Sequence, residues 1–174
     1  MALFQTSVLK SHLAQLDESV LNKAYKKYQN YFWNTTIQDN IKTAKEEQYQ
    51  ATFLNELFVN ILGYTLFPNP NPNLTTEFKN EKNARKADGA ILKDDTAIGV
   101  IELKGTKTKD LESIRRQAFD YKANQKGCVY VITSNFEKLR FYINDATEFE
   151  EFDLFSLTQV TVAQAFKNKN NRSF

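Results

Sequence analysis

The sequence contains a single cysteine, Cys128, and a single histidine, His12. One cysteine cannot form a disulfide within the chain, and one residue of each kind cannot build a Cys/His zinc site. Catalysis by a Cys–His pair would require these two distant residues to meet. Cys128 lies in an apolar run, which predicts a small buried side chain, and His12 lies in an amphipathic segment typical of a surface or packed histidine. Oxygen atoms therefore remain as the ligands for any metal ion.

Long apolar runs are also missing. No stretch approaches the roughly 18 to 20 residues that a transmembrane helix needs, and the N-terminus lacks the pattern of a signal peptide. The sequence predicts a cytoplasmic protein with no membrane contact. The three prolines all fall in Pro68–Pro72, a segment that cannot be helical and that separates a helical first part from a second part rich in strand patterns.

Charge of one sign is scarce as well, because 23 basic and 21 acidic residues leave a net charge of +2. This balance does not indicate the strongly basic surface of many nucleic-acid-binding proteins. Residues 79–93 and 104–116 are locally basic and residues 148–153 are acidic. Such runs usually form solvated faces. With 174 residues, of which 41% are hydrophobic, the chain is long enough to bury the core of one soluble domain.

Apolar spacing predicts helices in the first part. Residues 4–16 form one amphipathic segment, and Asp17 is a suitable N-cap for a second helix that continues through Tyr28. A longer helix is expected from Lys42 to Leu62, ended by Gly63.

Alternating and apolar patterns predict strands in the second part. Residues 86–92 and 96–104 flank a tight turn and are expected to pair as an antiparallel hairpin. A helix over 108–124 and strands over 128–133 and 139–143 follow. The order predicts an α/β fold, with a central mixed sheet of about four to five strands flanked by helices. We expect one domain, with residues 1–40 as an N-terminal helical segment packed on a core of residues 41–160 and residues 161–174 as a polar tail or linker.

Charged residues end the second strand of this hairpin. Glu102 and Lys104 are two positions apart, so in a strand they point to the same face. Asp88 lies on the partner strand, and paired strands are about 4.8 Å apart. Two carboxylates at that separation suit Mg²⁺, and Lys104 could supply a cation for developing charge or position a water molecule. The alternative is a structural salt bridge of Lys104 with one of the acids. Glu-x-Lys is a weak signal by itself, because Glu77-Phe-Lys79 also matches it.

The Lys42–Leu62 helix adds two further acids near its start. Glu46 lies along one flank of the apolar stripe and Glu47 along the other, so either could reach inward. The alternative is that both simply complement the helix dipole.

Asp88 and Glu102-Leu-Lys104 resemble the site of the PD-(D/E)xK nuclease superfamily, although Ala87 stands where a proline is typical. Gln117-Ala-Phe-Asp-Tyr121 is similar to the Gln-x-x-x-Tyr motif of type I restriction subunits and RecB-like nucleases. Helix packing is the simpler explanation for Gln117 and Tyr121, which share a helix face.

Residues 46–64 resemble the first helix of nuclease domains in type IIG restriction-modification enzymes, in which an acid completes the metal site. Glu46 is the better match and Glu47 the alternative. The resemblance therefore implies a restriction-endonuclease-like core, Mg²⁺ as the cofactor with Mn²⁺ as a substitute, and Glu46, Asp88 and Glu102 as metal ligands. It implies catalytic roles for these three acids and for Lys104.

The function that this resemblance implies is a Mg²⁺-dependent DNA endonuclease domain that serves as the cleavage module of a restriction-modification system. The expected partners are double-stranded DNA, methyltransferase and target-recognition domains in the same polypeptide or complex, and a second copy that dimerises transiently on DNA. The alternatives are a noncatalytic DNA-binding or assembly module and a RecB-like repair exonuclease. Contacts to DNA phosphates would be nonspecific and salt-dependent, and the candidates for them are Lys107, Lys109, Arg115 and Arg116. The resemblance implies that Gln117 and Tyr121 bind DNA or support the site.

Overall fold

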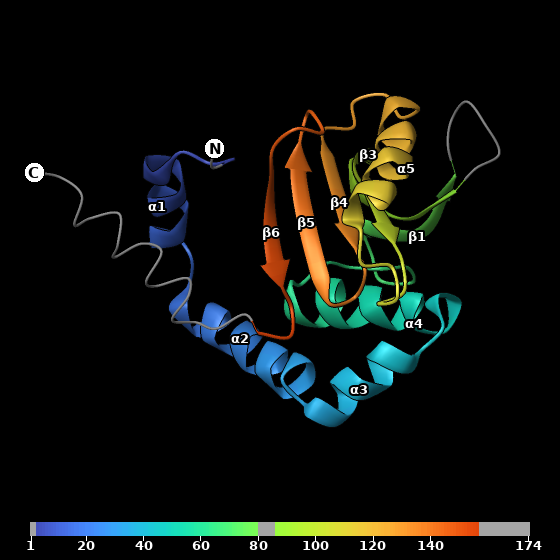
Figure 1. Cartoon of the computed structure of the whole chain (residues 1–174). Coiled ribbons are helices and arrows are strands. Elements are labelled where there is room, and N and C mark those ends of the chain that lie inside the picture. The colour runs from blue at the N-terminus through green and yellow to red at the C-terminus, as the bar shows by residue number, and fades with distance from the viewer. Residues whose placement is uncertain (1–2, 80–85, 157–174) are drawn as a thin grey trace, which may run out of the picture.

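The computed structural model describes residues 3–79 and 86–156 of the chain. Within these residues six strands form one mixed sheet in the order β1-β2-β3-β4-β5-β6, so each strand pairs with its neighbours along the chain (Figure 1). All pairs are antiparallel except β3 with β4, which is parallel. The strands are β1 (Leu74–Lys79), β2 (Lys86–Lys93), β3 (Thr96–Leu103), β4 (Tyr130–Ser134), β5 (Lys138–Ile143) and β6 (Phe149–Asp153).

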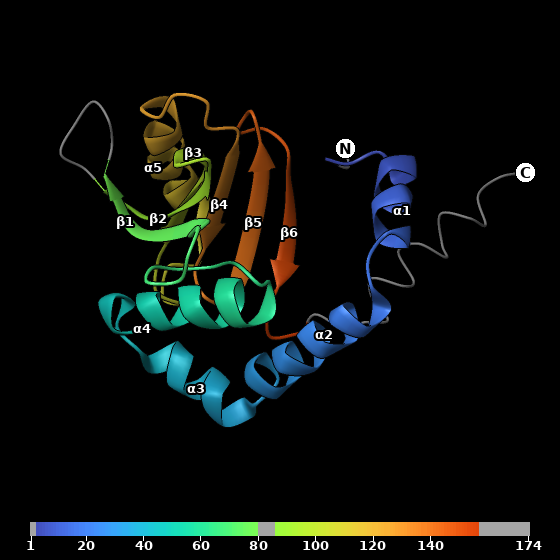
Figure 2. The same cartoon turned by 180° about the vertical axis from the view of Figure 1, so that it is seen from behind.

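Helices cover both faces of this sheet, and all but one of those in the described residues precede the sheet in the sequence. Helix α5, which makes the crossover between the parallel strands β3 and β4, covers one face, and α4 with the π-helix η1 covers the other. Helices α2 and α3 form a V next to α4, and α1 stands at the β6 edge (Figures 1 and 2). No helix in the described ranges is long and apolar enough to cross a membrane. The helices are α1 (Thr6–Ala14), α2 (Glu18–Phe32), α3 (Thr35–Thr43), α4 (Glu46–Phe53), η1 (Leu54–Ile61) and α5 (Leu111–Ala123).

The start of α2 follows the sequence prediction. The side chain of Asp17 accepts a hydrogen bond from the backbone N–H of Ser19, so one of the unpaired donors of the first turn is satisfied. Asn34 caps α3 and Asp110 caps α5 in the same way. Asp17 is therefore confirmed as an N-cap.

The single helix expected from Lys42 to Leu62 is wrong in its start and its regularity. Lys42 belongs to α3, and the backbone at Ala44 and Lys45 is extended, with ψ of 147° and 150°, so a new helix begins at Glu46. Beyond Phe53 the helix widens into η1, where Leu62 N–H bonds to Leu57 C=O, five residues back. An amphipathic period cannot distinguish one long helix from two whose apolar faces are in phase.

The hairpin of β2 and β3 is confirmed. Asp94 and Asp95, at the turn, have φ of 49° and 59°, which is the backbone of a type I′ turn whose twist matches the paired strands. The strands pair from Gly89 with Ile101 to Lys93 with Thr96. This register brings the end of β3 next to the start of β2.

The α/β class, the mixed sheet with flanking helices and the N-terminal helical part are confirmed. The described sheet has six strands, more than the four to five expected. Strands β1 and β6 lie at the two edges, where side chains on both faces are largely solvated, so their sequences carry charges that hide the strand pattern. The acidic run of residues 148–153 is thus an edge strand. The predicted tail over residues 161–174 lies outside the described residues.

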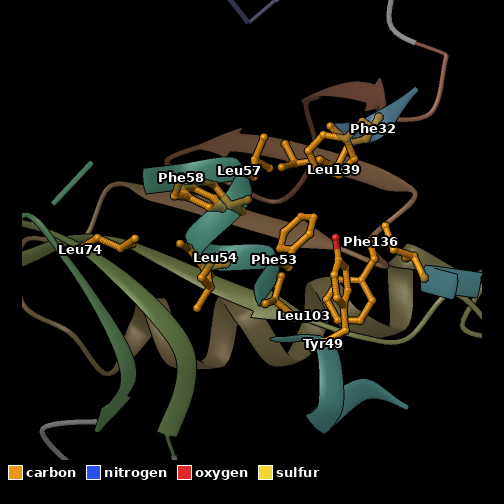
Figure 3. Packing of buried hydrophobic residues seen from close by; sticks show 14 of the residues in the cluster. Phe32, Tyr49, Phe53, Leu54, Leu57, Phe58, Leu74, Leu103, Phe136 and Leu139 are labelled. Carbon is orange, nitrogen blue, oxygen red and sulfur yellow. The ribbon is translucent and has the colours of Figure 1, made fainter. Parts of the chain in front are cut away.

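Phe53 is at the centre of the larger apolar core, between α4, η1 and the sheet. Its side chain is fully buried and packs against Phe136 at 5.2 Å and Phe32 at 6.4 Å between ring centroids. Figure 3 shows Phe53 pointing into the group formed with Leu103 and Phe136. The close packing fixes where α4 lies on the sheet, and therefore where the first residue of α4 lies relative to β3.

Helix α2 is tied to the core near its end. Phe32 is fully buried, and the hydroxyl of Tyr28 donates to the backbone C=O of Leu154, after β6, at 2.5 Å. Helix α1, by contrast, contains no buried residue. The boundary of the core at residue 41 stays a prediction.

We expect Tyr28→Phe to lower the free energy of unfolding by about 1 to 2 kcal/mol, because the substitution leaves the buried Leu154 C=O without this donor and barely changes volume. Urea denaturation of the parent and the variant measures the difference, with an unchanged slope against denaturant as the control for unaltered native compactness. Equal midpoints would contradict this role for the hydroxyl.

Candidate active site

Glu102 is placed by the alternation of β3. Ile101 and Leu103 belong to the core on the α4 side, and Val100 belongs to the smaller core under α5. Because neighbouring strand residues point to opposite faces, Glu102 shares the α5 face with Val100. Its residue exposure is only 1%. The loss of hydration of a carboxylate this deeply buried has to be offset by hydrogen bonds, an ion pair or a metal ion.

Asp88 lies beside this position, as the hairpin predicted. One carboxylate oxygen, Oδ2, accepts a hydrogen bond from the backbone N–H of Leu103 at 2.6 Å. The regular pairing of β2 with β3 ends one residue away, at Gly89 and Ile101. The Asp88 side chain thus replaces the backbone ladder where the two strands part.

Lys104, directly after β3, connects two acids. Its Nζ donates to Glu102 Oε1 at 3.0 Å and to Glu46 Oε1 at 3.1 Å, and also to the backbone C=O of Leu103 at 3.0 Å. The lysine side chain is 26% exposed, so this ion-pair network lies at the rim of the core. The salt bridge that the sequence offered as an alternative is therefore present, and it includes an acid from a third element.

Glu46 is the helix acid that reaches the site. It is the first residue of α4, and its Oε2 accepts from the backbone N–H of Gly105 at 3.3 Å. Glu47 is exposed. The extended backbone at Ala44 and Lys45 starts the helix at this point and aims its first turn at the end of β3.

Gln50 also belongs to this cluster, although no sequence motif marks it as a site residue. Its Nε2 donates to Asp88 Oδ1 at 3.2 Å and to Glu46 Oε1 at 3.4 Å. Gln50 lies one turn after Glu46, so the spacing of four residues was the available signal. Only the docking of α4 against β2 reveals that the same face meets an aspartate.

Burial and mutual repulsion shift the acids of this cluster. Burial, with the nearby charge of Asp88, raises the pKa of Glu102 to about 7, although Lys104 acts in the opposite direction. Burial likewise raises the pKa of Asp88, opposed by the hydrogen bond from Leu103 and the charge of Lys104. Burial disfavours the charge of Lys104, but its ion pairs with Glu102 and Glu46 outweigh this and raise its pKa. Glu102 is therefore the group that titrates near neutral pH.

The oxygen atoms of this cluster are of the chemical type that a hard cation such as Mg²⁺ binds. Three carboxylates and the Leu103 C=O gather within one connected network, and oxygen donors are what Mg²⁺ takes. One oxygen, Glu102 Oε2, is buried with no hydrogen-bond partner among the described residues. As the side chains stand, no three acidic, His or Cys residues of the described ranges form a group that could hold a metal. The Lys104 ammonium lies between Glu46 and Glu102, so a bound ion would require it to move.

Gln117 and Tyr121 lie on α5, as predicted, and touch each other. Gln117 Nε2 donates to Tyr121 Oη at 3.1 Å. Tyr121 is buried in the smaller core and Gln117 is exposed. Both line a surface hollow of about 680 Å³ together with Ser113, Arg116 and Asp120.

The basic residues proposed for DNA contact differ in their surroundings. Lys107 and Arg116 are exposed. Arg115 donates to the backbone C=O of Ala146 at 2.6 Å and pairs with Glu112, and Lys109 pairs with Glu137 at 3.1 Å. Lys107 and Arg116 are therefore more accessible to a phosphate than Arg115.

Neither single-copy residue joins the site. Burial raises the pKa of the Cys128 thiol, whose Sγ contacts Tyr130 C=O at 3.5 Å, so it is a poor nucleophile. The second Glu-x-Lys also lies elsewhere, because Glu77 on β1 forms an exposed ion pair with Lys86 at 3.0 Å. Context, and not the short motif, separates Glu102 from Glu77.

Comparison with known proteins adds little information about the function of this site. No protein-family model matches the chain, and no curated protein matches it. The chain is similar to a chain of the solved structure described as "cryoEM structure DrdV-DNA complex", with a TM-score of 0.47 and 16% identity over 86% of this chain and 94% of that chain. At this level of similarity, the function has to be argued from the site residues themselves.

Proposed function

We propose that the chain is a metal-dependent DNA endonuclease domain, the cleavage module of a restriction-modification system. The observation that supports it best is the convergence of Glu46, Asp88, Glu102 and Lys104, from three separate elements, at the end of β3. A structural salt bridge needs one acid for one lysine. Here a lysine and a glutamine connect three acids, one of which is buried at 1% exposure, so the arrangement costs stability that a purely structural role does not explain.

In this proposal Glu46, Asp88 and Glu102 are the residues that hold the ion. Mg²⁺ held there would supply a Lewis acid for the phosphoryl oxygen and would lower the pKa of a water molecule. Lys104, whose ion pairs raise its pKa further, would supply the cation for the substrate phosphate or would orient the attacking water. Leu103 N–H and Gln50 keep Asp88 in place.

DNA would approach over the rim where Lys104 is partly exposed and past Lys107, in the loop before α5. It would continue along α5, where Arg116 and Gln117 are exposed. Contacts from lysine and arginine to phosphates carry no sequence information, so target choice and modification would reside in further domains of the polypeptide or complex. One such site cuts one strand at a time, and a double-strand break therefore requires transient dimerisation on DNA or two successive cuts.

The direct test is incubation of the purified chain with supercoiled plasmid DNA and Mg²⁺ or Mn²⁺, with EDTA as the control. Nicked and linear products that depend on the metal are expected, and the ratio of linear to nicked product should rise with enzyme concentration if two copies pair. A RecB-like exonuclease would leave closed circles intact and degrade linear DNA. No product from either substrate would contradict nuclease activity.

A noncatalytic DNA-binding or assembly module is the second candidate, favoured by one observation. Lys104 pairs with both Glu46 and Glu102, so part of the negative charge of the cluster is balanced without a metal. This candidate predicts salt-sensitive DNA binding that is indifferent to Mg²⁺ and to the loss of Glu102. The nuclease predicts a binding isotherm for Mn²⁺ that disappears in Glu102→Gln.

Replacement of Gln50 should weaken the metal site without unfolding the chain. Gln50→Leu removes donors to Glu46 and Asp88, each hydrogen bond to a charged group contributing about 1.5 to 3 kcal/mol, so we expect an approximately tenfold or larger rise in the metal concentration for half-maximal cleavage. Gln48→Leu, on the other side of α4, is the matched control. A metal dependence equal to the parent's would rule out this role for Gln50.

A further inference from the structure

Three buried side-chain oxygens on the α5 face of the sheet have no hydrogen-bond partner among the described residues: Oε2 of Glu102, Oγ1 of Thr133 and the hydroxyl of Tyr142. Tyr142, on β5, is paired with Val131, whereas Thr133 and Glu102 are direct neighbours. Thr133 is fully buried and Glu102 is 1% exposed. A buried hydroxyl without a partner is costly, and valine has nearly the same shape without that cost. The presence of threonine at this position therefore suggests that the hydroxyl forms a hydrogen bond that valine could not provide.

The sheet makes these two residues neighbours. In the parallel pairing of β3 with β4, Glu102 is the direct partner of Thr133. Val131, two positions before Thr133, belongs to the core under α5 together with Val100, two positions before Glu102. Both side chains therefore point to the same face, on strands about 4.8 Å apart.

The neighbour of Thr133 on the other side is already hydrogen-bonded to two carboxylates. Arg140 on β5 is the direct partner of Thr133. Its guanidinium donates to Glu151 and Glu112, each at 2.7 Å. As an arginine it can only donate, whereas a threonine hydroxyl also carries a donor hydrogen that needs an acceptor. Among the direct strand partners of Thr133, Glu102 is the one that carries an acceptor; the Tyr142 hydroxyl, diagonal to Thr133, is a neutral and weaker acceptor than a carboxylate.

We propose that Thr133 is a positioning residue for Glu102: its hydroxyl donates a hydrogen bond to Oε2, directly after rotation of the side chain or through one water. This inference rests on the proposed function. With Oε2 held from the β4 side, Oε1 keeps its orientation toward Lys104, at the rim where the ion and the DNA would bind. Thr133 itself touches neither metal nor substrate.

A merely structural threonine and a positioning threonine predict opposite results. If the hydroxyl has no partner at any time, Thr133→Val removes a buried unsatisfied group and changes only thermal stability, upward. If the hydroxyl orients Glu102, Thr133→Val weakens metal binding by about tenfold, as is typical when a group that orients a metal ligand is lost. Thr133→Ser keeps the donor and should restore binding to within about threefold of the parent.

The test is calorimetric titration of Mn²⁺ into the parent, Thr133→Val, Thr133→Ser and Glu102→Gln, with thermal unfolding of each and Thr75→Val on β1 as the matched control. A tenfold higher Kd in Thr133→Val, with a Kd close to the parent's in Thr133→Ser and Thr75→Val and cooperative thermal unfolding in each, is the expected result. A parent-like Kd in Thr133→Val, while Glu102→Gln has lost binding, overturns the role of Thr133 and leaves the nuclease proposal intact. Binding that is absent from the parent, or equal in Glu102→Gln, overturns both.

Discussion

Glu102→Gln and Asp88→Asn should each lower the rate of metal-dependent DNA cleavage by about 10³-fold or more, with DNA binding retained. Each variant keeps the size of the side chain but replaces one acceptor oxygen with an NH₂ group and removes a negative charge that the proposed ion requires. Lys104→Met should be similarly inactive, because it removes the cation, but it should still bind Mn²⁺. Initial cleavage rates under single-turnover conditions, compared at saturating metal, measure these losses.

The chain offers its own control for this experiment. Glu77 is also followed two residues later by a lysine, yet it lies on β1 in an exposed ion pair with Lys86. Glu77→Gln should therefore cut DNA like the parent. If Glu102→Gln and Asp88→Asn cut as fast as Glu77→Gln does, the proposed site is wrong.

Glu102→Gln should also make the protein more stable at alkaline pH. The pKa of Glu102 is about 7 in the folded chain against 4.5 for an ordinary glutamate, because burial and Asp88 disfavour its charge. Between these two values the folded state binds more protons than the unfolded state, so stability falls as pH rises through this window. Each pKa unit corresponds to about 1.4 kcal/mol, and the loss above pH 7 is therefore about 3 kcal/mol.

Thermal unfolding of the parent and Glu102→Gln at pH 5 and pH 8.5 checks this sign. At pH 5 Glu102 is largely protonated in the folded chain and the two proteins should differ little, whereas at pH 8.5 the glutamine variant should melt several degrees higher. Glu77→Gln, on the surface, should show no such divergence. A variant that is less stable than the parent at pH 8.5 would mean that the ion pair with Lys104 outweighs burial.

Much of the site could be predicted because strands alternate. Glu102 and Lys104 share a face by their spacing alone, and the turn at Asp94 and Asp95 brings Asp88 near the end of β3. The Gln117 and Tyr121 contact follows from helical spacing in the same way. These features depend on contacts within a few residues or across one hairpin, which a sequence pattern can encode. The exact register of the hairpin also depends on a shift of one residue between Ile91 and Leu92, which no sequence pattern indicated.

The remainder depends on docking between distant parts of the chain. Glu46 is favoured over Glu47 by the extended backbone at Ala44 and Lys45, which shifts the helix start by four residues from Lys42. Gln50 and Thr133 carry no motif, because their importance arises only when α4 meets β2 and when β4 pairs in parallel with β3. The edge strands β1 and β6 were not predicted, because exposure on both faces removes the alternation of apolar and polar residues that marks a strand.

The sequential order of the strands has a consequence for how the molecule forms. Each antiparallel pair joins neighbours in the chain, so the hairpins can assemble early and quickly, whereas the β3 to β4 crossover, the docking of α4 and the contact of Tyr28 with Leu154 close longer loops. The Lys104 and Glu46 contact spans 58 residues and completes only when α4 docks. Native-state hydrogen exchange should therefore find openings in which α4 detaches while the sheet persists, and these openings would dismantle the acid cluster long before the protein unfolds.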